Sequence, residues 1–429
     1  MSNARKAAVN GLISIDKDGC YSNIAVDNAI KYAKLEGADA SFCSALIYGV
    51  LDKKNALDYI ISKLSSRPLS KLSLFVLEVL RISVLQLKYM DKIPPFAAIN
   101  EAVTLVKKSK DHYASGFVNA VLRSAIRQDV TLPEPKDAKS ISITDSCDVE
   151  IAKRLIADFG VEATHNILKA NENPLPVYIR CNTTKCTSDE LFKSLGDSGL
   201  MVNCVENMPY TLAVKGALEY TEAFKNGWFH VQDLACQCAC EALAPQCGMS
   251  VLDVCAAPGG KSFTLAQIMN NSGKIVSCDI HPHRVKLIDQ GADRLGYDSV
   301  VPMLNDATVY NNELGDFDRV LCDVPCSGVG VIHRKPDIRY KKASEFDGLP
   351  QLQFEILTTS SKYVKPQGVI VYSTCTLFKN ENIEVFEKFL AENSDFEPLP
   401  FENGEYFKTI LPNGENDGFF FARARHKEV

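Results

Sequence analysis

The sequence of 429 residues contains no long hydrophobic run. No stretch reaches the roughly 18 apolar residues that a transmembrane helix requires, so a membrane-spanning protein is not expected. The first residues, MSNARKAAVNGLISIDKDG, lack the apolar core and the small-residue cleavage site of a secretion signal. Fixed-period repeats and low-complexity segments are also missing, which argues against a repeat array. We therefore expect a cytoplasmic protein of ordinary globular composition.

Cysteine, in contrast, is abundant, with 15 residues in the chain. An odd number in a long chain without a secretion signal favours reduced thiols over a disulfide framework. The length exceeds what one ordinary hydrophobic core requires and predicts two or three domains.

The charge is distributed unevenly along the chain. Residues 1–130 carry 18 Lys and Arg against 12 Asp and Glu, a net charge of +6. Residues 131–429 carry 29 against 41, a net charge of −12, and the two sum to the overall −6. A basic N-terminal part on an acidic body is compatible with binding of a polyanion, and equally with an ordinary solvated helical surface.

The hydrophobic pattern divides the chain into three segments. Residues 1–130 are expected to form an all-α domain, because SKLSLFVLEVLRISVLQLKYM and ASGFVNAVLRSAIRQ have apolar residues at helical spacing. Residues 131–230 are expected to hold a linker and a small α+β subdomain. There, the proline-containing stretch 129–146 predicts the linker, and a helix follows around 148–170. PVYIRCN, SDELFKSLGDSG and YTLAVKG predict a strand, a capped helix and a second strand.

Residues 231–429 alternate between strand and helix patterns. Apolar segments predict strands at 250–254, 274–279, 299–304, 319–324 and 368–374, and helices at 282–295 and 350–364. This alternation is typical of a doubly wound, Rossmann-like α/β domain with a parallel sheet. The aromatic segment DGFFFARAR near the C-terminus predicts a further edge or antiparallel strand.

The stretch CAAPGGK, residues 255–261, joins a predicted strand to a predicted helix. Ligands of open α/β sheets bind at the carboxyl ends of strands, so this turn is a natural cofactor site. Gly260-Lys261-Ser262 imitates the end of a phosphate-binding loop, but Cys255 stands where that pattern requires glycine. The dinucleotide pattern G-x-G-x-x-G is absent. A turn of Ala, Pro and Gly suits a nucleoside cofactor without phosphates, such as S-adenosylmethionine.

Acidic residues end successive predicted strands. Asp279 could accept hydrogen bonds from both ribose hydroxyls of a nucleoside, and Asp306 from its adenine amino group. Asp323 carries a charge that complements the ammonium of the methionine part. Each acid alone is more typical of a cap or a turn, but their succession beside the glycine turn favours a nucleoside cofactor.

Two thiols follow neighbouring predicted strands, Cys326 in DVPCSG and Cys375 in VYSTCTLF. Addition of a thiolate to C6 of a pyrimidine converts C5 into an enamine-like carbon that accepts a methyl group, and thiols are also reasonable leaving groups. Asp323 could hydrogen-bond the N3/N4 edge of the base. Both thiols are plausible attackers by this chemistry, and either could instead be a small buried hydrophobe.

Two further motifs are weaker. The three cysteines in CQCAC, residues 236–240, match no zinc spacing and lie in a helical pattern, so we expect packing residues and no metal. Residues 333–342 form a basic stretch that we expect to be exposed. Its position after the DVPCSG motif makes contact of His333 and its basic neighbours with phosphate attractive.

The motifs CAAPGGK, DVPCSG, HRKPDIRY, YSTCT and DGFFFARA together resemble the RNA cytosine-C5 methyltransferase family. Upstream, AAINEAVTLVKK and ASGFVNAVLR resemble the NusB-like helical RNA-binding domain. That domain precedes the catalytic part in the family's RsmB/Sun (Fmu) branch of 16S ribosomal RNA methyltransferases. The resemblance implies a class I methyltransferase fold for the α/β domain. Val324 departs from the alanine that is usual in the family.

The resemblance also implies roles for individual residues. Cys375 corresponds to the attacking thiol, Cys326 to the thiol that assists product release, and Asp323 to the acid of the Asp-x-Pro-Cys motif. S-adenosylmethionine, which leaves as S-adenosylhomocysteine, is expected to be held by Cys255, Ala256, Ala257, Pro258, Gly259, Gly260, Lys261, Asp279, Asp306 and Asp323. The expected partner is 16S ribosomal RNA, naked or in an assembling subunit, without a metal, a membrane or an obligate protein partner.

Three other functions remain open from the sequence. The chain could methylate another RNA such as tRNA, act as a non-catalytic RNA-assembly factor, or bind nucleotide through Gly260-Lys261-Ser262. Cys255 argues against the nucleotide site, because the phosphate-binding pattern requires glycine at that position. Neither nucleotide binding nor a role as an RNA-assembly factor requires two cysteines at strand ends.

Overall fold

The computed structural model describes residues 2–170 and 175–428, which fall into two compact units. The first unit is Met1–Lys169 with Ile332–Ser344, and the second is Ala170–Val331 with Glu345–Val429. The expected division at residues 130 and 230 stays a prediction. None of the described helices is long and apolar enough to cross a membrane, and each of the 15 cysteines is a free thiol.

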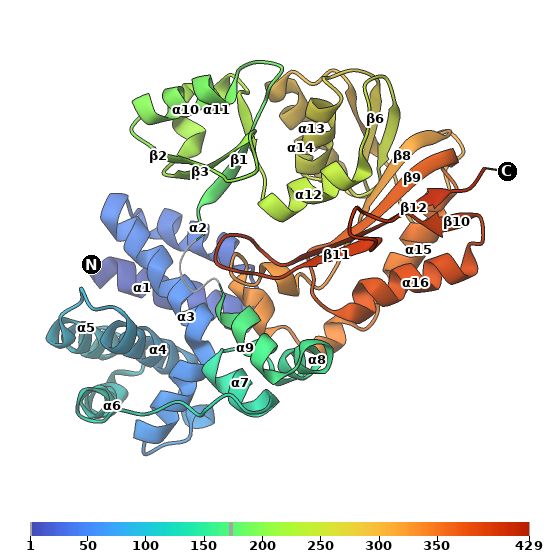
Figure 1. The fold of residues 1–429 in the computed structure, drawn as a ribbon. Helices are drawn as coiled ribbons and strands as arrows, with labels where there is room; N and C mark the ends of the chain where they lie inside the picture. The colour runs from blue at the N-terminus through green and yellow to red at the C-terminus, as the bar shows by residue number, and fades with distance from the viewer. Residues whose placement is uncertain (1, 171–174, 429) are drawn as a thin grey trace. The chain divides into compact units, whose positions relative to one another are not determined.

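The first unit is built from helices, coloured blue to green in Figure 1. Ser73 begins one of them by accepting a hydrogen bond from the amide of Val76, and Pro95 opens the next at the position where a missing N–H costs nothing. Their apolar faces share one core. The helices are α1 Ser2–Asp18, α2 Ser22–Ala33, α3 Gly37–Leu64, α4 Leu74–Tyr89, α5 Pro95–Lys107, α6 Ser115–Arg127, α7 Ala138–Thr144, α8 Val149–Phe159 and α9 Val161–Lys169, with 3-10 turns at Leu69–Lys71 and His112–Ala114.

The basic stretch after the DVPCSG motif belongs to the helical unit. Arg339 is 4% exposed and donates hydrogen bonds to the carbonyls of Asp145 and Leu168, at 2.9 and 3.3 Å. Burial lowers the pKa of His333 to about 3, so its ring is neutral. The expectation of an exposed, phosphate-contacting stretch is therefore wrong for these two residues, whose side chains satisfy groups inside the unit.

A tyrosine of the same stretch fastens it to helix α3. The Tyr340 hydroxyl donates to the carbonyl of Leu51 at 2.5 Å and accepts from the amide of Lys54 at 3.2 Å. The short 3-10 turn Pro336–Tyr340 presents this side chain. Residues 332–344 thus follow the DVPCSG motif in the chain and are anchored among the helices of the first unit.

The second unit begins with a small antiparallel sheet in the order β2-β3-β1-β4. Its elements are β1 Val177–Cys181, α10 Ser188–Asp197, β2 Met201–Cys204, β3 Thr211–Lys215, a 3-10 turn Leu218–Tyr220, α11 Glu222–Lys225 and β4 Phe229–Val231. Thr187 and Glu190 cap α10 reciprocally, which confirms the expected capped helix.

The remainder of the second unit is the expected doubly wound domain. Its sheet has the order β10-β12-β9-β8-β5-β6-β7, with β11 paired to β12. The strands β5 to β9 are parallel, and β12 is antiparallel to β9. The strands are β5 Ser250–Asp253, β6 Lys274–Asp279, β7 Val300–Leu304, β8 Phe317–Asp323, β9 Val364–Thr374, β10 Phe396–Pro398, β11 Phe407–Ile410 and β12 Phe419–His426.

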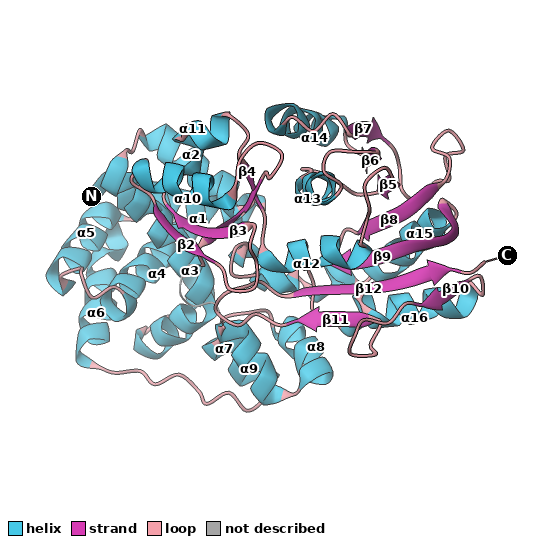
Figure 2. Ribbon diagram, turned by 45° about the horizontal axis from the view of Figure 1, so that its top comes forward, coloured by secondary structure: helices cyan, strands magenta, loops and turns pink. Residues whose placement is uncertain are grey.

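Helices cover both faces of this sheet, as Figure 2 shows. Alternate residues of one strand enter different cores: Val369 and Val371 pack on one side, Ile370 and Tyr372 on the other. Strands buried on both faces read as continuous apolar runs, which is why they were predictable. The helices are α12 Leu234–Leu243, α13 Gly260–Ile268, α14 Pro282–Leu295, α15 Leu349–Ser361 and α16 Ile383–Glu392, with 3-10 turns at Val329–Val331, Ala343–Phe346 and Lys379–Glu381.

Several local features differ from expectation. The predicted linker contains helix α7, which begins at the capping residue Asp137. The helix expected at 148–170 is two helices separated by Gly160, whose φ of +82° favours glycine. Strands β2, β4, β10 and β11 were not predicted, because each has only three or four residues.

A buried histidine makes the second unit sensitive to acid. Burial, followed by repulsion from Arg180 and Arg294, lowers the pKa of His230 to about 3, and its Nε2 lies 3.1 Å from Thr264 Oγ1. The unfolded chain takes up this proton near pH 6.5, whereas the folded chain does not until about pH 3. Stability is therefore complete above pH 6.5 and is lost as the pH falls below it, by ~1.4 kcal/mol per pH unit for this group.

We expect the replacement His230→Gln to reduce this acid sensitivity. Melting temperatures of the wild type and of H230Q at pH 7.5 and 5.5 provide the measurement. The drop between the two pH values should be smaller in H230Q, because glutamine binds no proton when the chain unfolds. An equal drop in both proteins would show that His230 does not titrate in this way.

Candidate active site

The two thiols singled out from the sequence lie side by side. Strands β8 and β9 are parallel neighbours, with Asp323 opposite Ser373, so both end at the same edge of the sheet. Cys326 follows the end of β8, and Cys375 directly follows β9. Their sulfur atoms are 3.2 Å apart, although 49 residues separate them in the chain. Both side chains are only partly buried.

The two thiols differ in how firmly they hold a proton. The hydrogen bond with Cys375, together with burial, raises the pKa of Cys326 well above its ordinary value. A negative charge on Cys375 also raises the pKa of Cys326. The two sulfurs share one hydrogen bond, in which either thiol can be the donor, and loss of a proton from Cys326 is disfavoured.

A carboxylate and an ammonium sit beside this thiol pair. Lys261 Nζ lies 2.6 Å from Asp323 Oδ2, and the Ser373 hydroxyl donates to Asp323 Oδ1 at 2.9 Å. Burial lowers the pKa of Lys261, but attraction and hydrogen bonding to Asp323, together with the neighbouring cysteines, raise it overall well above its ordinary value, so its ammonium stays charged. The glycine turn and the thiol-bearing strand ends thus meet through one ion pair. Lys261, expected to contact a cofactor, is oriented toward Asp323.

The backbone that presents Cys375 is held by two close-packed glycines. The amide of Gly330 donates to the carbonyl of Cys375 at 3.0 Å, and the amide of Gly418 donates to the carbonyl of Gly330 at 2.8 Å. A Cβ atom at position 330 would lie 2.2 Å from the Gly418 oxygen and 2.7 Å from the Cys375 oxygen. Only glycine fits at this crossing of three segments.

A buried glutamate joins the two thiol loops. Glu381, 1% exposed, accepts through Oε2 from the amide of Ser327 and from the side chain of Gln353, both at 2.9 Å. Gln353 also donates to the carbonyl of Pro325 at 2.9 Å, and the Ser327 hydroxyl lies 2.6 Å from that of Thr376. Sequence reasoning missed Glu381 and Gln353. The closest signal was the polar segment NEN shortly after the second thiol.

We expect Glu381 to act as a positioning residue. In Glu381→Ala the amide of Ser327 and the Gln353 side chain lose their common acceptor, so the loop that carries Cys326 shifts relative to Cys375. A shift of about 1 Å is enough to lower kcat by roughly 100-fold with little change in KM. Methyl-transfer kinetics measure this split.

Two further variants make the test specific. Glu381→Gln retains an acceptor oxygen and should recover part of the lost rate. Glu384→Ala removes an exposed glutamate from the next turn of the chain and should behave as wild type. Equal rates for E381A and E384A would show that the clamp does not position the thiols.

The glycine turn has the close packing expected of a cofactor loop. Gly259 has a φ of +110°, and a Cβ atom there would lie 2.4 Å from the ring of Phe263. A Cβ atom at Gly260 would meet nothing closer than 3.9 Å. Burial raises the pKa of Cys255 well above its ordinary value, which keeps that thiol neutral. The turn therefore offers open backbone at Gly260 without an added negative charge.

Behind the turn lies an acid that sequence reasoning did not use. Asp253 ends β5, is fully buried and accepts from the Ser262 hydroxyl at 2.7 Å. Ser262 in turn accepts from Ser277 at 2.8 Å, so β5, α13 and β6 are joined. Burial raises the pKa of Asp253 to about 7. Nothing in the sequence indicated that Asp253 connects these three elements, because the residue lies within a predicted strand.

The two expected nucleoside-binding acids lie at the ends of β6 and β7. Asp279 accepts from the amide of His281 at 2.9 Å and pairs with Arg284 at 3.2 Å. Asp306 accepts through Oδ1 from the amide and the hydroxyl of Thr308. A carboxylate has about four acceptor positions, so each acid retains capacity for a ligand hydroxyl or amino group.

A hollow of about 550 Å³ opens next to Asp306. The exposed apolar side chains Ile280, Leu304 and Val309 border it, together with Tyr310. Apolar faces beside a carboxylate acceptor suit a planar ring that carries an amino group.

The CQCAC cysteines lie close to the glycine turn, where the Cys240 thiol donates a hydrogen bond to the carbonyl of Lys261 at 3.7 Å. They lie on α12, where Cys240 is buried and Cys236 and Cys238 are partly buried. Over residues 2–170 and 175–428, no group of three His, Cys, Asp or Glu side chains could hold a metal ion.

Three family models match different parts of the chain. Residues 240–425 match "16S rRNA methyltransferase RsmB/F" and residues 2–127 match "NusB family". Residues 151–221 match the "RsmF/B-like, ferredoxin-like domain" of methyltransferases. The predicted resemblance and fold class are confirmed.

Individual relatives match over almost the whole length. The probable ribosomal RNA small subunit methyltransferase B of Bacillus subtilis is 36% identical, over 99% of both chains. The ribosomal RNA small subunit methyltransferase B of Escherichia coli O17:K52:H18 is 31% identical, over 91% of both. The crystal structure of PH0851 aligns with a TM-score of 0.81 at 25% identity, over 99% of this chain and 98% of that one.

Proposed function

The chain belongs to the 16S rRNA methyltransferase RsmB/F family, and we propose that it methylates C5 of a cytosine in 16S rRNA with S-adenosylmethionine as the donor. The observation that carries the proposal is the 3.2 Å separation of the Cys326 and Cys375 sulfurs beside the Lys261–Asp323 pair. Methylation of an exocyclic nitrogen or a ribose hydroxyl needs no thiol, whereas C5 of cytosine must first be activated.

The residues around the glycine turn fit the proposed cofactor. The open backbone at Gly260, the spare acceptor positions of Asp279 and Asp306, and the hollow beside Ile280 suit the parts of an adenosine. Asp323 would lie toward the charged methionine end. When bound, S-adenosylmethionine supplies the methyl group and leaves as S-adenosylhomocysteine.

The first step is proposed for Cys375. Its thiolate forms a bond to C6 of the cytosine, and the electron pair of the C5–C6 double bond moves to C5, which then bonds to the methyl carbon. The raised pKa of Cys326 keeps that thiol protonated at this stage, so Cys375 is the available nucleophile. This assignment agrees with the family resemblance, in which Cys375 corresponds to the attacking thiol.

The second step is proposed for Cys326. Once Cys375 is bonded to C6, its charge and its acceptor role disappear, and both had raised the pKa of Cys326. The Cys326 thiol can then release its proton to solvent and take the proton from C5. The electron pair of the C5–H bond restores the C5–C6 double bond, and Cys375 departs as a thiolate. The released proton balances the reaction.

Asp323 is proposed to hold the base in place. Its carboxylate is fixed by Lys261 and Ser373, which leaves acceptor capacity for the amino edge of cytosine. Attack at C6 comes from above the ring plane, so the target base must leave its stack. We also propose that residues 1–130 bind RNA, that residues 131–230 join the other two parts, and that residues 231–429 carry out methyl transfer.

The experiment that tests the function compares RNA from cells with and without the gene. Mapping of 5-methylcytidine across total RNA should reveal a site in 16S rRNA that is lost without the gene. Purified protein with labelled S-adenosylmethionine should restore it, on naked RNA or on an assembling subunit in the cytoplasm. Loss of a tRNA site instead, or of none, would overturn the assignment of the substrate.

A further inference from the structure

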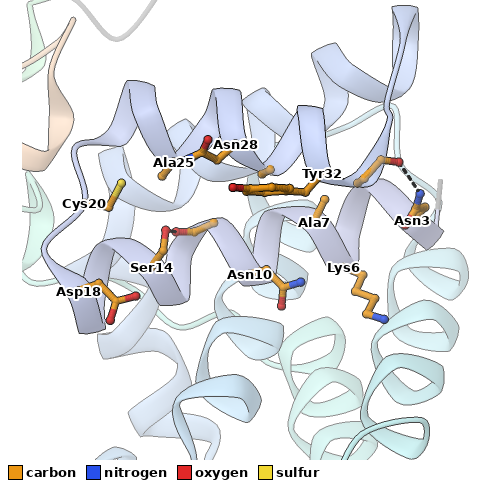
Figure 3. Close-up of a pocket in the computed structure, with 13 residues that line it drawn as sticks. Asn3, Lys6, Ala7, Asn10, Ser14, Asp18, Cys20, Ala25, Asn28 and Tyr32 are labelled. Atoms are coloured by element: carbon orange, nitrogen blue, oxygen red, sulfur yellow. Dashed lines mark hydrogen bonds between the residues drawn. The ribbon is translucent and has the colours of Figure 1, made fainter.

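The helical unit carries a groove between α1 and α2 that the catalytic site does not use. It has a volume of about 490 Å³ and is shown in Figure 3. Ala7 and Ala25 line its base, and the ring of Tyr32 lies in it between the two helices. Asn10 on α1 and Asn28 on α2 border it from opposite sides.

Tyr32 is unusual for an aromatic residue of a folded helix. Its side chain is 82% exposed, although the ring stands over a hollow into which it could pack. The alanines below it are buried and offer no side chain that covers the ring. A large, unpacked aromatic face in a groove marks a place where a second flat surface can stack.

Two polar side chains of the groove, those of Asn3 and Ser14, donate hydrogen bonds to backbone carbonyls. The side-chain amides of Asn10 and Asn28 make no hydrogen bond within residues 2–170 and 175–428. Each amide has both a donor and an acceptor, the combination that reads the edge of a nucleobase. Lys6 lines the groove beside them and provides one positive charge, and Asp18 at another part of the lining provides one negative charge. The chemistry is thus an aromatic platform, two bifunctional amides, a cation and a carboxylate.

We propose that this groove binds one unpaired nucleobase of the RNA substrate, stacked on Tyr32, with the adjoining phosphate near Lys6. The proposal rests on the proposed function, since it takes RNA as the substrate. Single-stranded RNA is recognised by stacking on aromatic side chains and by hydrogen bonds to exposed base edges. The net charge of +6 over residues 1–130 complements a polyanion. The exposed ring of Tyr32 and the two amides favour RNA over an acidic protein segment, because only RNA offers a flat base with a donor and acceptor edge.

One wall of the groove is linked to the segment that follows the first thiol motif. Ser22, the first residue of α2, hydrogen-bonds the carboxylate of Asp337, and the ammonium of Lys341 lies 5.6 Å from the ring centre of Tyr21. Both contacts lie within the helical unit. A base bound against α2 is therefore held on the same element that anchors residues 332–344.

Binding of the full-length protein to a fluorescein-labelled, single-stranded RNA of 12 nucleotides, without S-adenosylmethionine, tests the proposal. Tyr32→Ala should weaken binding by about 5- to 150-fold, the range for loss of one base–aromatic stack. Tyr32→Trp should bind as tightly as wild type. Lys6→Ala should reduce the slope of log K against log salt by about one, whereas Tyr32→Ala should leave the slope unchanged.

Tyr113→Ala is the matched control, because this tyrosine is also on the helical unit and 71% exposed but does not line the groove. It should bind RNA as wild type does. Binding by Tyr32→Ala within twofold of wild type, or an equal loss in Tyr113→Ala, would overturn the proposal even if 16S rRNA methylation is established. Conversely, a loss of RNA binding in Tyr32→Ala but not in Tyr113→Ala would support the groove even if the methylated base proved not to be cytosine.

Discussion

Replacing Cys375 with alanine is expected to abolish methyl transfer. In the proposed mechanism Cys375 forms the bond to C6 while Cys326 holds its proton, so without Cys375 the C5 carbon is not activated. Loss of a covalent nucleophile costs on the order of 10⁴-fold or more in kcat. Transfer of label from S-adenosyl[methyl-³H]methionine to RNA is the measurement, with RNA binding recorded in parallel.

Cys247→Ala is the control for this loss, because Cys247 is an exposed free thiol outside the site. It should retain wild-type activity. Cys375→Ala should still bind RNA, since the expected groove and the charge of residues 1–130 are unaffected. Methyl transfer by Cys375→Ala within a factor of ten of wild type would contradict the covalent mechanism.

Replacing Cys326 with alanine is expected to have a different and equally large effect. The first step does not need this thiol, so Cys375 still adds to C6 and C5 still receives its methyl group. Without Cys326, the proton on C5 is not removed and Cys375 cannot leave. A covalent protein–RNA complex should then accumulate, up to one RNA per protein, and survive a denaturing gel.

The physical reason for two distinct outcomes is the asymmetry of the thiol pair. The sulfurs are 3.2 Å apart and share a hydrogen bond, so they cannot both be charged without strong repulsion. In the proposed mechanism the proton stays on Cys326, whose pKa is raised, and Cys375 is the attacking group. If Cys375→Ala accumulated the complex and Cys326→Ala did not, the two roles would be reversed.

Much of this site could be predicted because parallel strands impose a simple geometry. Cys326 and Cys375 follow two apolar strands, and the carboxyl ends of neighbouring parallel strands meet at one edge. The same rule located the glycine turn and the acids Asp279 and Asp306. The sequence did not reveal which strands are neighbours, so the distance between the thiols needed the structure.

The supporting residues could not be predicted for a related reason. Glu381 and Gln353 lie on different elements and act through hydrogen bonds to backbone and side-chain groups far away in the chain. Such bonds leave no periodic pattern in the sequence. Within the basic stretch 333–342, His333 and Arg339 were misread because charged letters indicate solvent, whereas Arg339 satisfies buried carbonyls of the helical unit.

Mass spectrometry of the complex formed by the Cys326→Ala protein tests the central claim most directly. After digestion with protease and nuclease, the account predicts a single modified peptide, containing Cys375, that carries a cytidine with one added methyl group. A nucleotide attached to any other residue, or a complex whose cytidine lacks the methyl group although S-adenosylmethionine was supplied, would contradict it.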